Sequence, residues 1–272
     1  MTLVAVWLFD ETQIHAVADT RISHDRGVAT EHGPKILPIA VLCRRPSPSG
    51  FFSVEHFRAE FGFAYSGSTL SALAAHALAN IVCSNLIGLE DSRPPSLEDI
   101  ARAVGSICIQ YMGDVCALSD KAGLFKAILF GFCPQSKKPL AFKLTPETTT
   151  FPIKGALDER DLTTGNVVII GDQTQLLRDR IDERRATAEH PIVAADAPKF
   201  ALQSLIDENA IESVGGAIQQ GSVSLHRFDV VATARPIQPQ PPSPRNYGRF
   251  VLGFDIDSMS TIGSYQVSLS AR

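Results

Sequence analysis

The chain has 272 residues and a mass of 29.4 kDa, enough for one large domain or two small ones. Hydrophobic residues make up 44% and charged residues 20%. These values are typical of a globular chain with a core and exclude a disordered protein, a collagen or a coiled coil. With 25 Lys+Arg against 29 Asp+Glu, the net charge of −4 lacks the basic excess that indicates nucleic-acid binding.

The N-terminus and the cysteines indicate a cytoplasmic chain. No apolar run approaches the ~18 to 20 residues that a membrane helix requires. The sequence Met1-Thr2-Leu3 has no basic lead and runs through an apolar stretch into Asp10-Glu11, which predicts a first strand rather than a secretory signal. The five cysteines are odd in number and form no CxxC pair, so we expect reduced, buried thiols and no metal site.

The first half of the chain predicts strands followed by two helices. Residues 3–9 and 13–18 predict a hairpin, and residues 35–42 and 61–65 predict further strands, the former at an edge or a bulge because of Pro38. Residues 44–50 have the composition of a loop. Apolar residues at helical spacing over 70–82 predict a helix capped by Ser68 or Thr69. A second helix is predicted from Ser96, where Ser96 and Asp99 form a capping-box pattern.

The second half repeats this order. Residues 127–133, 140–144 and 167–170 predict strands, residues 176–183 and 199–209 predict helices, and residues 222–232 predict a closing strand pair. Strands between paired helices favour layered sheets with helices outside. We expect a domain over residues 1–234. The proline-rich run 236–244 predicts a linker into an extension over 235–272, with a hairpin of residues 249–255 and 264–269, and truncation at Ala234 is expected to keep the fold.

Three short pieces of sequence form a joint pattern: Thr2 directly after Met1, the turn 18–21 (Ala-Asp-Thr-Arg), and Lys35 at the start of a strand. Their order and spacing resemble the proteasome β-subunit family, most closely its simpler bacterial members of the HslV and Anbu type. Asp19 and Lys35 are sixteen positions apart, as in the family, and the stretch from Thr2 to Asp19 is one residue longer. Residues 65–68 (Tyr-Ser-Gly-Ser) resemble the family's small-Gly-small turn, so the resemblance covers roughly residues 2–232.

This resemblance implies an α+β fold, the four-layer α/β/β/α sandwich of the N-terminal nucleophile (Ntn) hydrolases, and a threonine-type endopeptidase without a cofactor. Once Met1 is removed, Thr2 carries a free α-amine, whose unperturbed pKa of about 7.7 to 8 suits a general base. Lys35 matches the lysine whose charge favours the neutral amine, and Asp19 matches the acid that keeps this lysine charged and oriented. Gly67 matches the residue whose N–H stabilises the oxyanion.

The same resemblance implies contacts with substrate and partners. Ser23 would line the strand that pairs with an extended peptide. An apolar specificity pocket would be shaped by Ile22, Leu37, Tyr65, Thr69 and Leu73. The implied partners are a homo-oligomeric ring, a peptide or unfolded-protein substrate and an ATP-dependent unfoldase, with neither nucleic acid nor a membrane.

Two turns depart from the family pattern. The serine-bearing turn before the third helix reads Gly171-Asp172-Gln173-Thr174 here, which leaves Asp172 either as the helix N-cap or as an altered residue in support of the threonine. Further on, Glu212 and Gly215 stand where the family carries Asp and Ser. These changes spare the nucleophile, the lysine and the oxyanion glycine, and affect the groups that support them.

Each candidate residue also has an ordinary structural interpretation. Thr2 is compatible with plain removal of Met1, Asp19 with a turn ion pair to Arg21, and Lys35 with a solvated strand end. The sequence therefore leaves three functions open: a threonine endopeptidase in a ring, a catalytically silent ring or scaffold protein with the same fold, and an Ntn amidase that acts on a small amide.

Overall fold

A five-stranded sheet contains the N-terminal strand, which lies between two neighbouring strands. The computed structural model describes residues 2–24, 27–147, 152–236, 247–258 and 269. The strand order is β11-β1-β2-β12-β13, and all pairs are antiparallel. The strands are β1 (Leu3–Asp10), β2 (Gln13–Asp19), β11 (Val167–Gly171), β12 (Ile218–Val223) and β13 (Phe228–Val231). The predicted hairpin of the first two strands is confirmed.

The larger sheet has six strands in the order β10-β9-β8-β6-β5-β7. They are β5 (Ile36–Arg45), β6 (Val54–Gly67), β7 (Leu86–Ile87), β8 (Phe125–Phe132), β9 (Pro139–Glu147) and β10 (Lys154–Asp161). β7 pairs with β5 only at Cys43 and Arg44. Pro38 therefore lies on an edge stretch of β5, as predicted, where its missing N–H costs no ladder bond.

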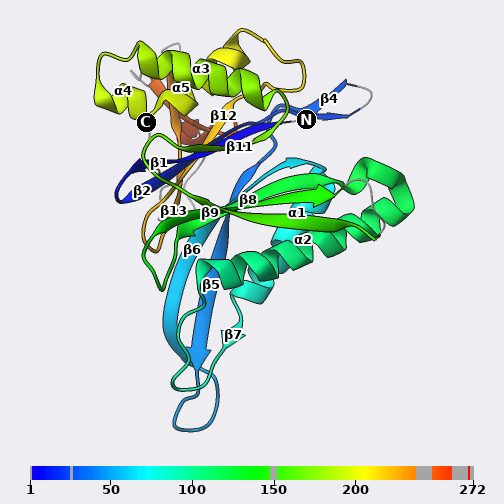
Figure 1. Cartoon of the computed structure of the whole chain (residues 1–272), viewed down its shortest axis with the longest axis vertical. Coiled ribbons are helices and arrows are strands. Elements are labelled where there is room, and N and C mark those ends of the chain that lie inside the picture. Colours follow the sequence, from blue (N-terminus) through cyan, green and yellow to red (C-terminus); the bar gives the residue numbers. More distant parts are fainter. Residues whose placement is uncertain (1, 25–26, 148–151, 237–246, 259–268, 270–272) are drawn as a thin grey trace.

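Helices cover the outer face of each sheet (Figure 1). They are α1 (Thr69–Cys83), α2 (Leu97–Ser119), α3 (Thr174–Ala186), α4 (Pro191–Ala195) and α5 (Ala197–Asp207). α2 begins with the predicted capping box between Ser96 and Asp99, which satisfies two N–H groups that a helix start leaves open. α1 follows Ser68, whose side chain makes no capping hydrogen bond.

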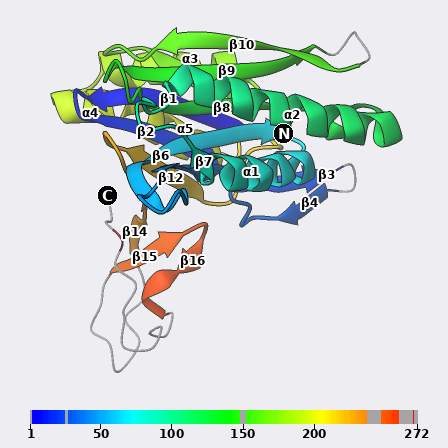
Figure 2. The same ribbon diagram turned by 90° about the horizontal axis from the view of Figure 1, so that it is seen from below.

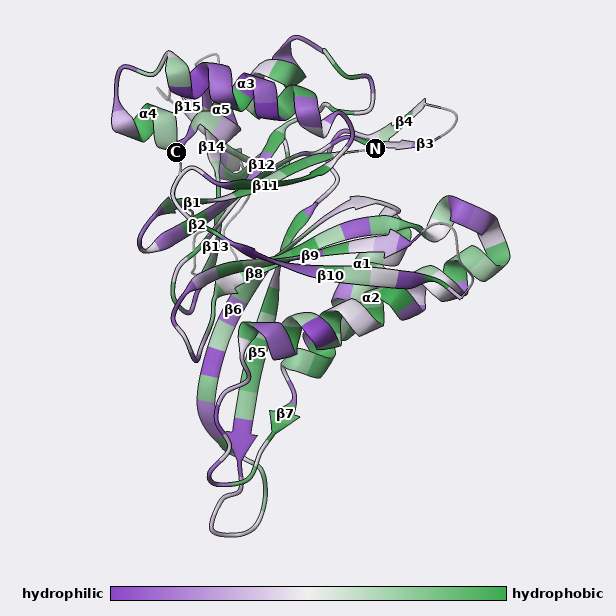
Figure 3. Ribbon diagram, in the orientation of Figure 1, coloured by the Kyte–Doolittle hydropathy of each residue, from purple (hydrophilic) through white to green (hydrophobic). Residues whose placement is uncertain are grey.

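Buried apolar side chains form three clusters, and Figure 3 shows the hydrophobic residues running along the strands. One cluster lies between the two sheets, one between the six-stranded sheet and α1 and α2, and one between the five-stranded sheet and α3 and α5. β1 serves two of them: Val4 and Val6 face the other sheet, whereas Leu3, Ala5 and Trp7 face the helices. Alternation along one strand thus places Thr2 at the end of a strand buried on both sides.

Two small sheets complete the described fold. β3 (Ile22–His24) pairs with β4 (Gly27–Thr30) beside the N-terminus. β14 (Thr233–Pro236), β15 (Tyr247–Val251) and β16 (Phe254–Asp255) form a three-stranded sheet, named here the C-terminal sheet, which projects from the body in Figure 2. Two short 3₁₀ turns, η1 (Asp120–Gly123) and η2 (Ile256–Ser258), follow α2 and β16.

Several elements differ from the sequence expectation. Arg44 and Arg45 end β5 instead of opening a loop, and β4, β7, β10, β14 and α4 were not predicted. β10 is an edge strand with mostly exposed residues, so it lacks the apolar alternation that identifies a strand. Residues 249–255 are not one strand, because the chain reverses at Leu252 and Gly253. Of its predicted partner, residues 264–268 lie outside the described residues.

Candidate active site

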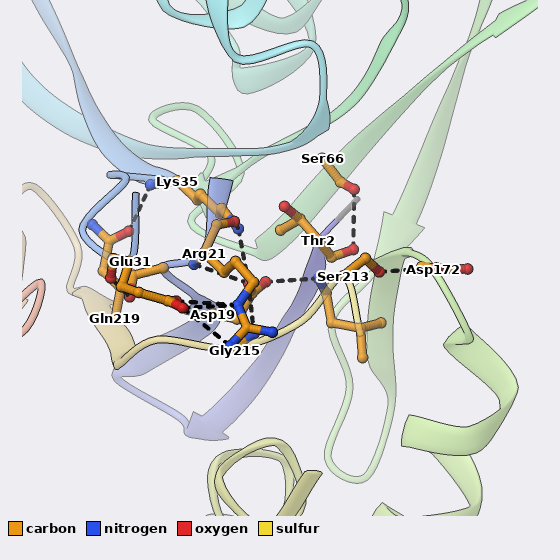
Figure 4. A network of polar contacts seen from close by, with 12 residues as sticks. Thr2, Asp19, Arg21, Glu31, Lys35, Ser66, Asp172, Ser213, Gly215 and Gln219 are labelled. Atoms are coloured by element: carbon orange, nitrogen blue, oxygen red, sulfur yellow. Dashed lines mark hydrogen bonds and ion pairs between the residues drawn. The ribbon is translucent and has the colours of Figure 1, made fainter. Parts of the chain in front are cut away.

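Asp19 ends β2 with a fully buried carboxylate that accepts four hydrogen bonds (Figure 4). Oδ1 accepts the N–H of Leu3 at 3.0 Å. Oδ2 accepts the Lys35 Nζ at 2.9 Å and the N–H groups of Arg21 and Gly215 at 3.2 and 3.3 Å. One carboxylate therefore ties the residue after Thr2 to the lysine and to two loops.

Lys35 directly precedes β5, and its side chain is 1% exposed. Its Nζ also donates to the carbonyl oxygen of Arg21. The side chain of Gln219 fixes the backbone here, because its Oε1 accepts the N–H groups of Lys35 and Ile36 at 2.7 and 2.9 Å while its Nε2 donates to the Ile36 carbonyl at 2.7 Å. The lysine is thus held at both its backbone and its ammonium, unlike a solvated strand-end residue.

The electrostatics of the pair reflect its burial. Burial raises the pKa of the Asp19 carboxyl and lowers the pKa of the Lys35 ammonium, and the attraction between the two groups opposes both shifts. If one member of a buried ion pair is removed, the remaining unpaired charge is strongly destabilising. The fold therefore maintains a charge pair next to Thr2 at a cost in desolvation, which is typical of functional sites.

Thr2 is 5% exposed and lies between the two sheets' ends. Its carbonyl oxygen accepts two hydrogen bonds, from Ser66 Oγ at 3.1 Å and from the N–H of Asp172 at 3.0 Å. In Figure 4 the Thr2 side chain extends toward the Lys35 side of the site. The residue is therefore fixed from β6, from the turn after β11 and, through Leu3, from Asp19.

Two glycines allow the backbone to come close at this point. Gly171, at φ +126°, ends β11, and a Cβ there would lie 1.8 Å from the carbonyl oxygen of Thr2. Gly67, at φ +124°, ends β6 and is exposed, and a Cβ there would lie 2.6 Å from the carbonyl oxygen of Leu124. Only glycine fits both the backbone angles and the space.

Asp172 lies in the turn after β11. The sequence left it either as the N-cap of the third helix or as an altered residue that supports Thr2, and its contacts match neither alternative fully. The N-cap of α3 is Gln173, at φ +48° and without a capping side-chain bond. Asp172 accepts the N–H of Gln173 on Oδ1 and the hydroxyl of Ser213 on Oδ2, both at 3.0 Å. Its carboxylate therefore joins two loops, while its own N–H contacts Thr2.

Glu212 and Gly215 use their backbones rather than side chains. Glu212 is exposed, and its carbonyl oxygen accepts Arg21 Nη1 at 2.8 Å. Gly215 donates to Asp19, and its carbonyl accepts the N–H groups of Thr20 and Arg21 at 3.1 and 3.0 Å. A Cβ on Gly215 would lie 2.3 Å from the Arg21 guanidinium carbon, so the serine of the family pattern does not fit here without a shift.

The expected substrate-pocket residues occupy different environments. Tyr65 is 1% exposed, its hydroxyl donates to the Pro34 carbonyl at 2.8 Å, and burial raises the pKa of its phenol to about 12. Thr69 is hydrogen-bonded to this phenol. Leu37 and Leu73 are partly buried and pack against the hydrophobic cluster that contains Tyr65. These residues therefore belong to the core that borders this side of the site.

Ser23 and Ile22 lie on β3. The Oγ of Ser23 is buried without a hydrogen-bond partner in the described part of the chain. Ile22 fills the space over Gly33, where a Cβ would lie 2.3 Å from its Cδ1.

A cleft of about 730 Å³ opens on the side of Asp172. Its walls come from the β3–β4 hairpin, the start of α3 and the loop before β12; they are Ser23, His24, Gly27, Val28, Asp172, Gln173, Leu176, Ala210, Ile211, Glu212 and Ser213. Its volume lies in the range of ligand clefts. Asp172, whose N–H bonds the Thr2 carbonyl, is among the lining residues, whereas Thr2 itself is not.

Sequence reasoning missed four residues of this site: Ser66, Ser213, Gln219 and Glu31. Arg21 pairs with Glu31 through Nη2 at 3.1 Å, which fixes the turn after Asp19. Ser66 and Ser213 are sequence neighbours of the motif residues Gly67 and Glu212, and this adjacency was the signal that could have identified them. Gln219 lies 184 residues from Lys35, and nothing local marks it.

Across the described residues, no group of three or more His, Cys, Asp or Glu side chains is arranged to hold a metal ion. None of the helices in the described ranges combines the length and the apolar character needed to span a bilayer.

No protein-family model matches the chain, and no curated protein matches it. Among solved structures, it is similar to a chain of the helical assembly of the Anbu complex from Pseudomonas aeruginosa. The TM-score is 0.56, the sequence identity is 14%, and the match covers 85% of this chain and 85% of that chain. At this identity the similarity concerns the fold alone.

Proposed function

We propose that this chain is a threonine-type endopeptidase of a proteasome-like assembly, with Thr2 as its nucleophile once Met1 is removed. The observation that carries the proposal is the buried Asp19–Lys35 pair, whose carboxylate accepts the N–H of Leu3 beside Thr2. A buried lysine costs desolvation that a purely structural strand end would avoid. Placed against an N-terminal threonine, the same lysine has a chemical use.

In the proposed reaction, the free α-amine of Thr2 takes the proton of its own hydroxyl as Oγ attacks the scissile carbonyl carbon. The C–N bond breaks, the amine product leaves with that proton, and an ester on Thr2 remains. Water activated by the same amine then hydrolyses the ester. Met1 has to be absent because an amide nitrogen at Thr2 is not basic.

Lys35 and Asp19 set the protonation of this amine. A cation nearby lowers the pKa of an amine, which keeps it neutral and able to accept a proton near pH 7. Asp19 holds the lysine charged at 2.9 Å. The N–H of Gly67, an exposed residue, is the proposed donor to the oxyanion, because glycine allows the substrate to approach the backbone closely.

The fold supports the proposal at the level of architecture. We propose that the three clusters belong to the four-layer α/β/β/α sandwich of Ntn hydrolases, with residues 235–272 as an extension. The Anbu chain to which this fold is similar comes from a helical assembly. By analogy, we propose a cytoplasmic homo-oligomer, with a ring and an ATP-dependent unfoldase as its expected form and partner.

The test combines mass spectrometry with a covalent probe. The intact mass shows whether Met1 is removed, and a peptide vinyl sulfone or epoxyketone should add to Thr2. The Thr2→Ala protein is the control and should remain unlabelled. A processed wild-type protein that also remains unlabelled contradicts the peptidase.

A second candidate is a catalytically silent scaffold with the same fold. It is favoured by the support of Thr2, where Asp172 and Gly215 replace the family's serines and the Glu212 side chain is exposed. An unlabelled Thr2 in an intact assembly would establish this alternative. Labelling together with cleavage of small amides only, and not of an unstructured protein, would instead indicate the Ntn amidase.

A further inference from the structure

The loop of residues 31–34 leads directly into Lys35 and is held by the core on one side. Thr20 donates its hydroxyl to the Glu31 carbonyl at 2.5 Å and accepts the Gly33 N–H on its own carbonyl at 2.8 Å. Tyr65 donates to the Pro34 carbonyl at 2.8 Å. The backbone position of Lys35 therefore depends on how firmly this loop is held.

The outer side of the loop contacts the C-terminal sheet through His32. This exposed side chain places Nδ1 2.7 Å from the carbonyl oxygen of Leu252. A carbonyl only accepts, so Nδ1 carries the proton and donates. The imidazole also lies on the ring of Phe254, with centroids 4.5 Å apart and a tilt of 40°. His32 thus makes both a directional bond and a ring contact with the same turn.

That turn has an unusual backbone. Val251 of β15 pairs with Phe254 of β16, so only Leu252 and Gly253 connect the strands. Both have positive φ, +52° and +81°, which suits a two-residue hairpin turn but is uncommon for leucine. A Cβ at Gly253 would lie 2.8 Å from His32 Nδ1. The space beside the imidazole therefore accepts only glycine at position 253. A strained backbone such as that of Leu252 persists where the surrounding contacts hold it.

The C-terminal sheet also contacts the segment around Ala217, which leads into Gln219, the residue that bonds the Lys35 N–H. The Cβ position at Gly253 is 3.6 Å from the Cβ of Ala217, whose N–H bonds Thr20 Oγ1 at 2.7 Å. Arg249 of β15 bonds Asp257 of the following turn η2, with Nη2 at 2.6 Å and Nε at 2.8 Å from Oδ1. A turn braced in this way can hold a loop in place.

We propose that the C-terminal sheet acts as a clamp on the 31–34 loop, with His32 as the positioning residue that aligns Lys35 for Thr2. The catalytic part of this inference depends on the proposed function, whereas the mechanical part, the restraint of the loop, does not. His32 itself touches neither Thr2 nor the Asp19 carboxylate in the contacts described above.

The test measures loop restraint and chemistry separately, in full-length protein and in a chain ending at Ala232. Hydrogen exchange reports the backbone amides of residues 31–37, and inactivation by a peptide vinyl sulfone gives a binding constant and a maximal rate. His32→Ala and the truncation should speed exchange in this loop and lower the maximal inactivation rate about tenfold, with the binding constant changed less than twofold. His32→Asn keeps a donor and should recover most of the rate.

The matched control is His226→Ala, which removes another exposed histidine with a ring contact, to Phe57, on the turn after β12. It should change neither exchange at 31–37 nor inactivation. Unchanged exchange in His32→Ala would overturn the clamp even if the truncated chain fails to fold. If wild-type protein is not labelled at all, the proposed peptidase fails, and exchange still decides whether the loop is clamped.

Discussion

The two sides of Thr2 are built differently. On one side, Asp19 and Lys35 are buried, ion-paired and bonded to four further backbone groups. On the other side, Asp172 and Ser213 form a partly exposed link beside an open cleft. The first side has little freedom to vary without leaving a buried charge unpaired, whereas the second can change side chains because solvent and backbone groups satisfy them.

Replacing Thr2 tests whether both sides serve one nucleophile, and it has the largest expected effect. Thr2→Ala should abolish cleavage and labelling, because it removes the only hydroxyl in the proposed reaction, while the assembly measured by sedimentation stays intact. Thr2→Ser, which keeps a hydroxyl, should retain measurable activity. Cleavage at the wild-type rate by Thr2→Ala would show that Thr2 is not the nucleophile, so the two sides would not serve a common reaction.

Lys35→Ala tests the buried side. We expect a loss of ~10²-fold or more in kcat/KM, since the charge that keeps the amine neutral is gone. Stability should fall by about 3–5 kcal/mol in chemical denaturation, because Asp19 is left buried without a counter-charge.

The double variant Asp19→Asn with Lys35→Met separates the two effects of Lys35. It removes both charges, so it should recover much of the stability and none of the activity. Full activity in this variant would show that the pair is structural only.

Gly171→Ala tests the close approach of the turn to Thr2. A Cβ 1.8 Å from the Thr2 carbonyl oxygen forces the backbones apart, so we expect a melting temperature lowered beyond that of a backbone-strain control and a large loss of labelling. The control is Gly165→Ala, at φ +85° with nothing within 4 Å of its Cβ, which should cost only ~1 kcal/mol. Equal effects of the two substitutions would contradict the packing argument.

The pH dependence follows from the lysine. kcat/KM should rise as the Thr2 α-amine loses its proton, and fall again as Lys35 loses its own. Burial lowers the pKa of Lys35 below the usual 10.5, so the falling limb should lie below pH 10.5. Lys35→Arg keeps a cation at all these pH values and should lose the falling limb, although its rate will be lower. A falling limb that persists in Lys35→Arg would assign it to another group.

The exposed side should give the smallest effects. Ser213→Ala removes one hydrogen bond to Asp172 and should lower kcat/KM about fivefold, as expected for ~1 kcal/mol. Glu212→Gln changes an exposed side chain and should leave kcat/KM unchanged within twofold. A loss as large as that of Lys35→Ala from either substitution would show that this side is as constrained as the other.

Local sequence determined the elements with strong, short-range signals. The β1–β2 hairpin and the capping box of α2 arise from alternation and from residues three positions apart, and both are present. β10 and α4 escaped prediction because an exposed edge strand and a five-residue helix bury too little apolar surface to leave a pattern. For the same reason the reversal at Leu252 and Gly253 was missed, since a leucine at positive φ gives no turn signal.

The candidate site divides along the same line. The spacing of Thr2, Asp19 and Lys35 was visible in the sequence because these residues bracket consecutive strands of the first 35 residues. Only the tertiary structure brought Gln219 to Lys35 and Ser66 to Thr2, because each comes from a distant segment and bonds across the two packed sheets. The tertiary structure likewise brought Ser213 to Asp172, 41 residues away in the sequence. Side chains that carry a charge into the core need several partners to offset desolvation, and those partners are set by the fold rather than by proximity along the chain.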